Sequence, residues 1–109
     1  TIYYTGPTPN RKGEVIGSCG PTTSSRMDHF TSLLLKHGLV GMIGKGERSK
    51  EISLAIKKYG AVYFITIGGA GAYLSEKVKT AKVIAYKDLG PEAIYRLTIE
   101  DFPVIVSVI

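Results

Sequence analysis

The chain has 109 residues, 44% of them hydrophobic, and its formal net charge is +5 at pH 7. This size suits one soluble domain over residues 1–109 and leaves no room for a second, and no apolar run is long enough to span a bilayer. A single cysteine excludes an internal disulfide and any metal or iron–sulfur site built from this chain alone, and it suggests a reducing compartment, so we expect a cytoplasmic protein. The positive charge favours an acidic partner or an anionic substrate.

The first third of the chain is predicted to hold two short strands and a helix. The first strand covers residues 2–4 and ends at the glycine and prolines of residues 6–10. A second short strand is predicted over residues 14–17. A helix is predicted over residues 25–37, with Gly38 as its end. Its buried face is predicted from the apolar residues at helical spacing, which are Met27, Phe30, Leu33 and Leu34.

The loop before this helix combines residues that favour an anion site. Residues 22–25 are four consecutive hydroxyl side chains, any of which could cap the helix. Arg26 then places a cation in the first turn, where the helix dipole is already positive, at a cost of about 0.3 kcal/mol or more. An anion held by backbone N–H groups, hydroxyls and the guanidinium would offset that cost. We therefore predict that Thr22, Thr23 and Arg26 bind an anion.

The next strand and helix repeat this pattern. Residues 39–43 form a nearly continuous apolar run, which predicts a strand covered on both faces. A glycine loop follows, and the next helix is predicted to begin at a serine cap and to end at Gly60. Its apolar face is expected from Ile52, Ala55, Ile56 and Tyr59. Cations again crowd the helix start, which indicates a place for a negative group, and they are Lys45, Arg48 and Lys50.

The last part of the chain is predicted to be rich in strands. Residues 61–67 form the strongest predicted strand, and the glycines of residues 68–71 lead into a short helix that ends near Val78. Further strands are predicted over residues 82–86, 94–99 and 104–108. The repeated order of strand, glycine loop and helix predicts parallel strands joined by helical crossovers, so we expect a layered α/β domain.

The glycine loops do not match nucleotide-binding fingerprints. Leu74 stands where the third glycine would follow Gly69 and Gly71, and the loop around Lys45 does not have the P-loop spacing. No basic stripe interleaved with aromatic residues is present, so we expect no nucleic-acid partner. A stand-alone anion- or nucleotide-binding module nevertheless stays open as an alternative to an enzyme.

The two cationic loops are expected to meet. Loops that follow neighbouring parallel strands lie at the carboxyl edge of the sheet, where open α/β folds bind ligands. One loop supplies Thr22, Thr23 and Arg26, and the other supplies Lys45 and Arg48. Two separate cationic points suit a ligand with two anionic ends, such as a small dicarboxylate or a phosphate with one carboxylate.

The sequence resembles a known family over essentially its whole length. The similar motifs are GPTTSSRMD at residues 20–28, YYTGPTP at residues 3–9, MIGKGERS at residues 42–49, GGA at residues 68–70 and AYKDLGPEAI at residues 85–94. Taken in chain order, these motifs resemble the β subunit or C-terminal domain of the class I, iron–sulfur fumarases and the L-tartrate dehydratases. The resemblance implies a swivelling β/β/α domain with a partly parallel sheet.

The same resemblance implies a function. This chain would be the β component of a hydro-lyase that interconverts L-malate and fumarate. The enzyme would be a hetero-oligomer, active only with an α subunit that holds a [4Fe-4S] cluster. In the family, residues at the positions of Arg26 and Lys45 hold substrate carboxylates, and the cluster binds the leaving hydroxyl as a Lewis acid. L-tartrate or a related hydroxy-dicarboxylate is the alternative substrate, because these compounds differ by one substituent.

Two expectations concern the catalytic residue and the extent of the domain. The resemblance makes Thr22 the candidate for removing the C3 proton, but an aliphatic hydroxyl is a poor base at neutral pH. A hydrogen-bonding role for Thr22 therefore stays open. Relatives carry an upstream segment with an Arg-Asp-x-Ala-His run whose arginine also contacts substrate, and we expect this chain to lack that part of the family domain.

Overall fold

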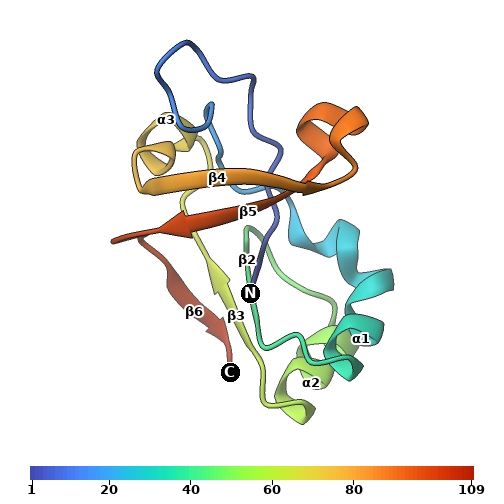
Figure 1. Cartoon of the computed structure of the whole chain (residues 1–109). Helices are drawn as coiled ribbons and strands as arrows, with labels where there is room; N and C mark the ends of the chain where they lie inside the picture. The colour runs from blue at the N-terminus through green and yellow to red at the C-terminus, as the bar shows by residue number, and fades with distance from the viewer. The chain divides into compact units, whose positions relative to one another are not determined.

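The chain folds into two compact units in a computed structural model that describes residues 1–109 (Figure 1). Unit 1 consists of Thr1–Tyr4, Pro21–Ile67 and Val104–Ile109, and unit 2 consists of Thr5–Gly20 and Gly68–Pro103. The expected α/β class, with a partly parallel sheet and helices between strands, is confirmed. That the 109 residues act as a single domain stays a prediction.

Unit 1 is built on a four-stranded sheet in the order β1-β2-β3-β6. Its strands are β1 (Ile2–Tyr3), β2 (Gly41–Gly44), β3 (Val62–Ile65) and β6 (Ile105–Val108). The first three are parallel, and β6 runs antiparallel to β3. Met42 at the centre of β2 pairs with Ile2 on one side and Tyr63 on the other. All four residues of β2 are buried, so the prediction of a covered strand is confirmed.

Two helices connect the parallel strands of unit 1 and lie next to each other (Figure 1). A 3₁₀ turn, Ser24–Met27, precedes α1 (Asp28–Lys36), and α2 spans Lys50–Lys58. The predicted serine cap of α2 is confirmed, because the Ser49 hydroxyl accepts a hydrogen bond from the Ile52 amide. Both predicted stops also hold, with left-handed φ angles of +101° at Gly38 and +67° at Gly60.

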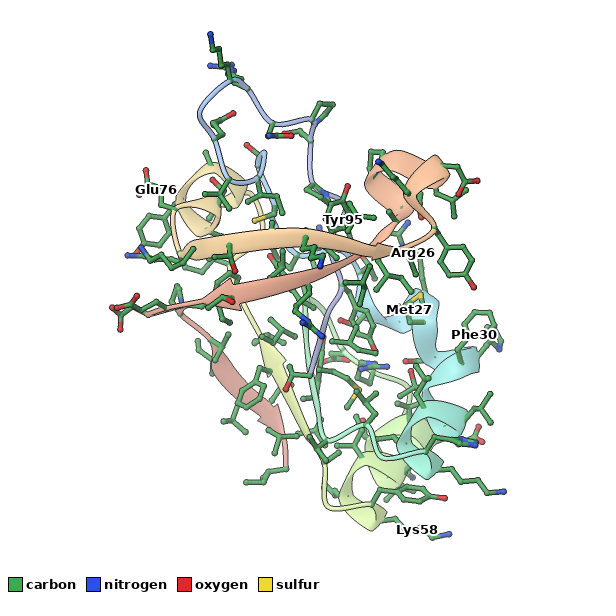
Figure 2. The ribbon with its side chains drawn as sticks, in the orientation of Figure 1. Arg26, Met27, Phe30, Lys58, Glu76 and Tyr95 are labelled. Atoms are coloured by element: carbon green, nitrogen blue, oxygen red, sulfur yellow. The ribbon has the colours of Figure 1, made fainter.

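The predicted buried face of the first helix is wrong. Phe30 and Leu33 are 59% and 60% exposed, and Met27 and Leu34 are also exposed, whereas Thr31 and Leu35 are buried. Figure 2 shows Phe30 pointing away from this segment. The α-helix begins only at Asp28, after the 3₁₀ turn, and it is held inward by polar contacts of Asp28 and Thr31 with Arg48. These polar contacts, and not the apolar periodicity, set which face is buried.

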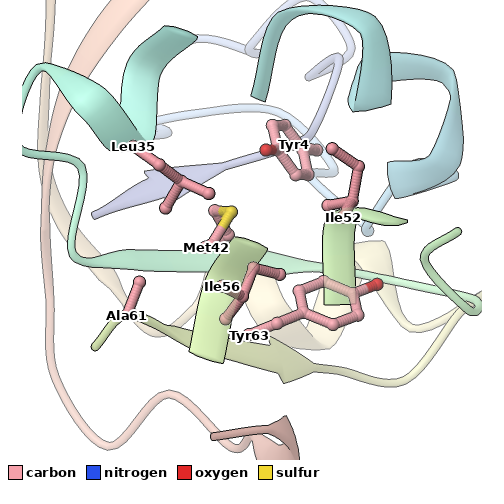
Figure 3. Packing of buried hydrophobic residues seen from close by; sticks show 7 residues of the cluster. All are labelled: Tyr4, Leu35, Met42, Ile52, Ile56, Ala61 and Tyr63. Atoms are coloured by element: carbon pink, nitrogen blue, oxygen red, sulfur yellow. The ribbon is translucent and has the colours of Figure 1, made fainter. Parts of the chain in front are cut away.

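The core of unit 1 lies between the sheet and the two helices. Figure 3 shows Ile52 and Ile56 of α2 facing Met42 and Tyr63 of the sheet. The spacing of these two isoleucines places them on one face of α2, as predicted. Tyr59, which was predicted to share that face, is 43% exposed at the end of the helix. The remaining core residues are Tyr4, Leu35 and Ala61.

Unit 2 contains a two-stranded antiparallel sheet. Its elements are α3 (Gly71–Ser75), β4 (Val78–Ala85), a 3₁₀ turn over Lys87–Glu92 and β5 (Ile94–Ile99). The helical crossover pattern therefore stops after β3, because β4 pairs with β5 and not with the parallel sheet. A small apolar cluster of Ile16, Cys19 and Val78, flanked by Ala81 and Leu97, forms the core of this unit.

The strand predicted over residues 14–17 is absent. Glu14 closes a tight turn, since its amide donates to the Arg11 carbonyl and its carboxylate accepts from the Arg11 amide. Further along, the Ser18 carbonyl accepts a hydrogen bond from the Thr8 amide at 2.9 Å. The Glu14 amide is thus used to close a turn, and the Ser18 carbonyl, directly after residues 14–17, is used within a loop.

No helix of the chain is sufficiently long and apolar to cross a membrane.

Candidate functional site

The candidate site of unit 1 forms where β1 ends and another segment takes its place beside β2. The Tyr4 amide donates to the Ile43 carbonyl, which is the last ladder bond of this edge. The next position is taken by residues 22–24, because the Lys45 amide donates to the Thr22 carbonyl at 3.3 Å and the Ser24 amide donates to the Lys45 carbonyl at 3.0 Å. Thr23 and Lys45 thus form an isolated parallel bridge.

This replacement brings residues from the two cationic loops together. Thr22 and Thr23 are half-buried, whereas Arg26 and Lys45 are exposed. None of these four side chains makes a hydrogen bond or an ion pair with another residue of the chain. Two hydroxyls, a guanidinium and an ammonium are therefore free on two segments whose backbones are hydrogen-bonded to each other. The expected hydroxyl cap is absent, since the N-cap residue Thr23 makes no side-chain capping bond.

The negative group expected at the start of α2 is found within the chain. The Asp28 carboxylate, at the first position of α1, accepts a hydrogen bond from the Ser49 amide at 3.0 Å. Its other oxygen accepts from the Arg48 Nε at 2.7 Å. One carboxylate therefore stabilises the dipoles of both helices, because it lies near the N-terminus of each.

Arg48, predicted to lie with Lys45 in the site, has its side chain inside unit 1 and 0% exposed. Its Nη2 donates to the Thr31 hydroxyl at 2.8 Å, and its Nη1 lies 3.4 Å from the Met42 sulfur. The guanidinium carbon lies 5.5 Å from the ring centre of Tyr4 and 4.9 Å from that of Tyr63. A direct contact of Arg48 with substrate stays a prediction, and these interactions would compete with it.

Tyr63 is a polar link that the sequence did not predict. Its phenol oxygen lies 2.8 Å from both the Ser24 hydroxyl and the Gly46 carbonyl. Because the carbonyl can only accept, the phenol donates its single proton to Gly46 and accepts from Ser24. Burial raises the pKa of this phenol, although the hydrogen bond from Ser24 and the charge of Arg48 act in the opposite direction. The sequence feature that could have indicated this link is a polar-tipped tyrosine within a strand of apolar residues.

We expect Tyr63→Phe to loosen the two loops while preserving the core. The phenylalanine ring fills the same space, but the buried Ser24 hydroxyl and the Gly46 carbonyl lose their shared partner. An unsatisfied buried group costs about 1–3 kcal/mol, so the free energy of unfolding should fall by about that amount. Urea unfolding followed by circular dichroism measures the loss. Tyr59→Phe, at an exposed tyrosine outside the site, serves as the control and should unfold at the wild-type urea concentration.

The side chains of this chain do not fit an iron–sulfur cluster. No group of three or more histidine, cysteine, aspartate or glutamate side chains is arranged to hold a metal ion. Cys19 is fully buried in unit 2, and burial raises the pKa of its thiol, which disfavours the thiolate that a cluster requires. Any cluster associated with the activity would therefore need ligands from outside this chain.

Comparison with known proteins identifies similar sequences across the full chain. A family model described as Fumarase C-terminus matches residues 1–109. The chain is 42% identical to the anaerobic class I fumarate hydratase of Escherichia coli K12 and to the mitochondrial fumarate hydratase 1 of Leishmania major, in each case over 98% of the chain and 20% of the relative. It is 36% identical to a putative L(+)-tartrate dehydratase subunit beta of Methanocaldococcus jannaschii, over 97% of the chain and 57% of that relative. The chain thus spans about a fifth of the fumarate hydratases that it matches.

Proposed function

Because this chain belongs to the family of fumarase C-terminal domains, we propose that it is the carboxylate-binding component of a hydro-lyase that interconverts L-malate and fumarate. One observation carries the proposal. Arg26 and Lys45 are exposed, have no partner within the chain, and extend from backbone segments that are hydrogen-bonded to each other. Two free cations on a fixed frame suit the two carboxylates of a C4 dicarboxylate.

The two cations would bind their carboxylates in different ways. The planar Arg26 guanidinium can donate two parallel hydrogen bonds to one carboxylate and so fix its orientation. The Lys45 ammonium acts as a point charge for the other carboxylate. Holding both ends of the substrate leaves the C2–C3 bond between them, so the two cations position the reacting carbons without taking part in proton transfer.

Thr22, four residues before Arg26, is the residue of this chain that we consider for removing the proton at C3. Its backbone is fixed on both sides, since its amide donates to the Tyr4 carbonyl at 2.8 Å and its carbonyl accepts from the Lys45 amide. The hydroxyl is free and half-buried. We propose Thr22 as the candidate base, with hydrogen bonding to the substrate as the alternative role. Thr23, whose hydroxyl is also free, is proposed to contact a carboxylate.

The remaining parts of the activity would come from outside this chain. Since the side chains here do not fit a [4Fe-4S] cluster, we propose that an α subunit or N-terminal domain holds it. The complete enzyme would then be a hetero-oligomer or a longer chain, in keeping with the fifth of the fumarate hydratases that this chain spans. A cytoplasmic location is part of the same proposal.

L-tartrate is the second candidate substrate. The β subunit name of the Methanocaldococcus jannaschii relative, of which this chain covers 57%, favours it. Tartrate and malate share two carboxylates and differ by one hydroxyl group. Arg26 and Lys45 would bind both compounds equally, so residues beyond this chain would decide between them.

The test is the dehydration of L-malate, followed as fumarate absorbance under anaerobic conditions. The chain is assayed alone and after mixing with the cluster-bearing α subunit, and we expect turnover only in the mixture. Turnover of L-tartrate in place of L-malate would support the second substrate. A mixture with a spectroscopically intact cluster that acts on neither compound would overturn the hydro-lyase proposal, and binding of ATP or NAD by the chain alone would support a nucleotide module in its place.

A further inference from the structure

The Arg48 guanidinium is the most highly connected charged group of unit 1. It contacts four different parts of the unit: Asp28 and Thr31 on α1, Met42 on β2, Tyr4 after β1, and Tyr63 on β3. Its side chain is fully buried, whereas that of its ionic partner Asp28 is 15% exposed. Figure 3 shows Tyr4 and Tyr63, between whose rings the guanidinium is held, within the same cluster.

Asp28 extends this connection to the start of α2. One carboxylate oxygen binds Arg48, and the other binds the amide of the next residue, Ser49. Both atoms that face Asp28 therefore belong to the segment that leads from the Lys45 loop into α2. Because one carboxylate makes both bonds, at 2.7 Å and 3.0 Å, it joins the start of α1 to the start of α2.

The pair is adjacent in sequence to both candidate carboxylate ligands. Asp28 follows Arg26 by two residues, and Arg48 follows Lys45 by three. The free side chains of the site are thus attached to short segments whose far ends are joined by an ion pair. At the near ends, the segments are joined by the backbone bonds of Lys45 with Thr22 and Ser24. The two segments that carry Arg26 and Lys45 are therefore joined to each other at both ends.

We infer that Arg48 and Asp28 are positioning residues of the proposed hydro-lyase, whose ion pair sets the separation and direction of Arg26 and Lys45 for the two carboxylates of the substrate. This inference rests on the proposed function. In this inference Arg48 acts through its ion pair, in place of the predicted direct contact with substrate. Arg48 also keeps Asp28 engaged, so the carboxylate does not neutralise the positive charge of the site.

Stability alone is a weak reason for such a pair. Replacing a buried ion pair by uncharged residues of similar size is often neutral for stability, whereas removing one partner leaves an uncompensated charge and is strongly destabilising. The double variant Asp28→Asn with Arg48→Met is therefore informative. Asparagine still accepts from the Ser49 amide, methionine fills the space of the arginine stem, and the net charge of the chain does not change.

The test compares variants in the assembled enzyme that contains the cluster-bearing part. We expect the double variant to unfold within a few degrees of the wild-type Tm, while its KM for L-malate rises about 10-fold or more and exceeds the change in kcat. The single variant Arg48→Lys, which keeps the charge but loses the fork of donors, should show a smaller rise in KM. Lys57→Met, which removes an exposed charge in the last turn of α2 without touching the pair, should keep the wild-type KM. A stable double variant with wild-type KM and kcat would overturn the inference.

A second measurement does not depend on activity. Hydrogen exchange of the Lys45 and Ser24 amides, which join the two segments, should be about 10-fold faster in the double variant, and Asp28→Asn alone should show the same direction if the double variant fails to assemble. Exchange in the middle of α2 should stay unchanged. If the wild-type assembly has no hydro-lyase activity, the proposed function fails, and the exchange rates still decide whether the pair orders the loops. Unchanged exchange at Lys45 and Ser24 in a stable variant would refute the positioning role.

Discussion

Arg26→Ala and Lys45→Ala should each lower kcat/KM for L-malate by about 10²–10³-fold in the assembled enzyme, the size of effect seen when one preorganised donor to a charged group is removed. Each substitution deletes a cation that has no partner within the chain, so its loss leaves no buried group unsatisfied. The free energy of unfolding should therefore change by less than about 0.5 kcal/mol. The measurements are steady-state kinetics and thermal unfolding of the same preparations.

The matched control for these two variants is Lys36→Ala, at the last position of α1. It removes the same charge from an exposed position outside the site, so it reports any general effect of net charge on substrate attraction. Arg26→Lys adds a second comparison, because lysine keeps the charge but cannot donate two parallel hydrogen bonds. Near-normal turnover in both alanine variants, or an equal loss in Lys36→Ala, would refute the dicarboxylate assignment.

The parallel strands of unit 1 could be predicted because their local signals are strong. The runs that became β2 and β3 are short, apolar and bounded by glycines. The helices of unit 1 end at Gly38 and Gly60, and α2 has a cap at Ser49. Each of these features depends on residues close in sequence. In the last third, the expected parallel pattern gave way to two antiparallel pairs. β4 pairs with its sequence neighbour β5 across a short turn, and β6 pairs with the distant β3.

The buried face of α1 could not be predicted from the periodicity of its apolar residues alone. Leu33, Leu34 and Leu35 are consecutive, so leucine is available for burial whichever way the helix is turned. Only Leu35 is buried, one turn after the buried Thr31. That choice follows from the hydrogen bond between Thr31 and Arg48, whose partners are 17 residues apart in the sequence. A pattern read within one helix does not contain this information.

The site shows the same division between local and distant information. Sequence reasoning grouped Lys45 with Arg48, because both precede α2 and both carry a charge. The structure separates them, since Lys45 is exposed and Arg48 is buried with partners on α1 and next to two tyrosine rings. The adjacency of Thr23 and Lys45, by contrast, was expected, because loops after neighbouring strands meet at one edge of a sheet. The strand expected before Thr23 is absent, however, and residues 22–24 instead pair beside β2 where β1 ends.

Gly44→Ala should destabilise unit 1 by about 2–3 kcal/mol. Gly44 ends β2 directly before Lys45, and a Cβ added there would overlap the Ser24 hydroxyl and lie 3.0 Å from Cδ2 of Tyr4. Ser24 is fully buried and bonded to Tyr63, so it has no space into which to move. Overpacking of this kind typically costs about 1–3 kcal/mol, and the backbone shift would also break the bonds between Lys45 and residues 22 and 24.

Urea unfolding of Gly44→Ala should therefore show a lower midpoint, and the assembled enzyme should lose turnover along with it. Gly6→Ala is the control, because nothing lies within 4 Å of its added Cβ, and it should change the free energy of unfolding by less than about 0.5 kcal/mol. Ser24→Gly removes the side chain that the new methyl group meets. If the overlap is the cause, the double variant will be more stable than the sum of the two single losses predicts, because the second change relieves the strain of the first. Strictly additive losses would show that the destabilisation by Gly44→Ala does not arise from overlap with the Ser24 side chain.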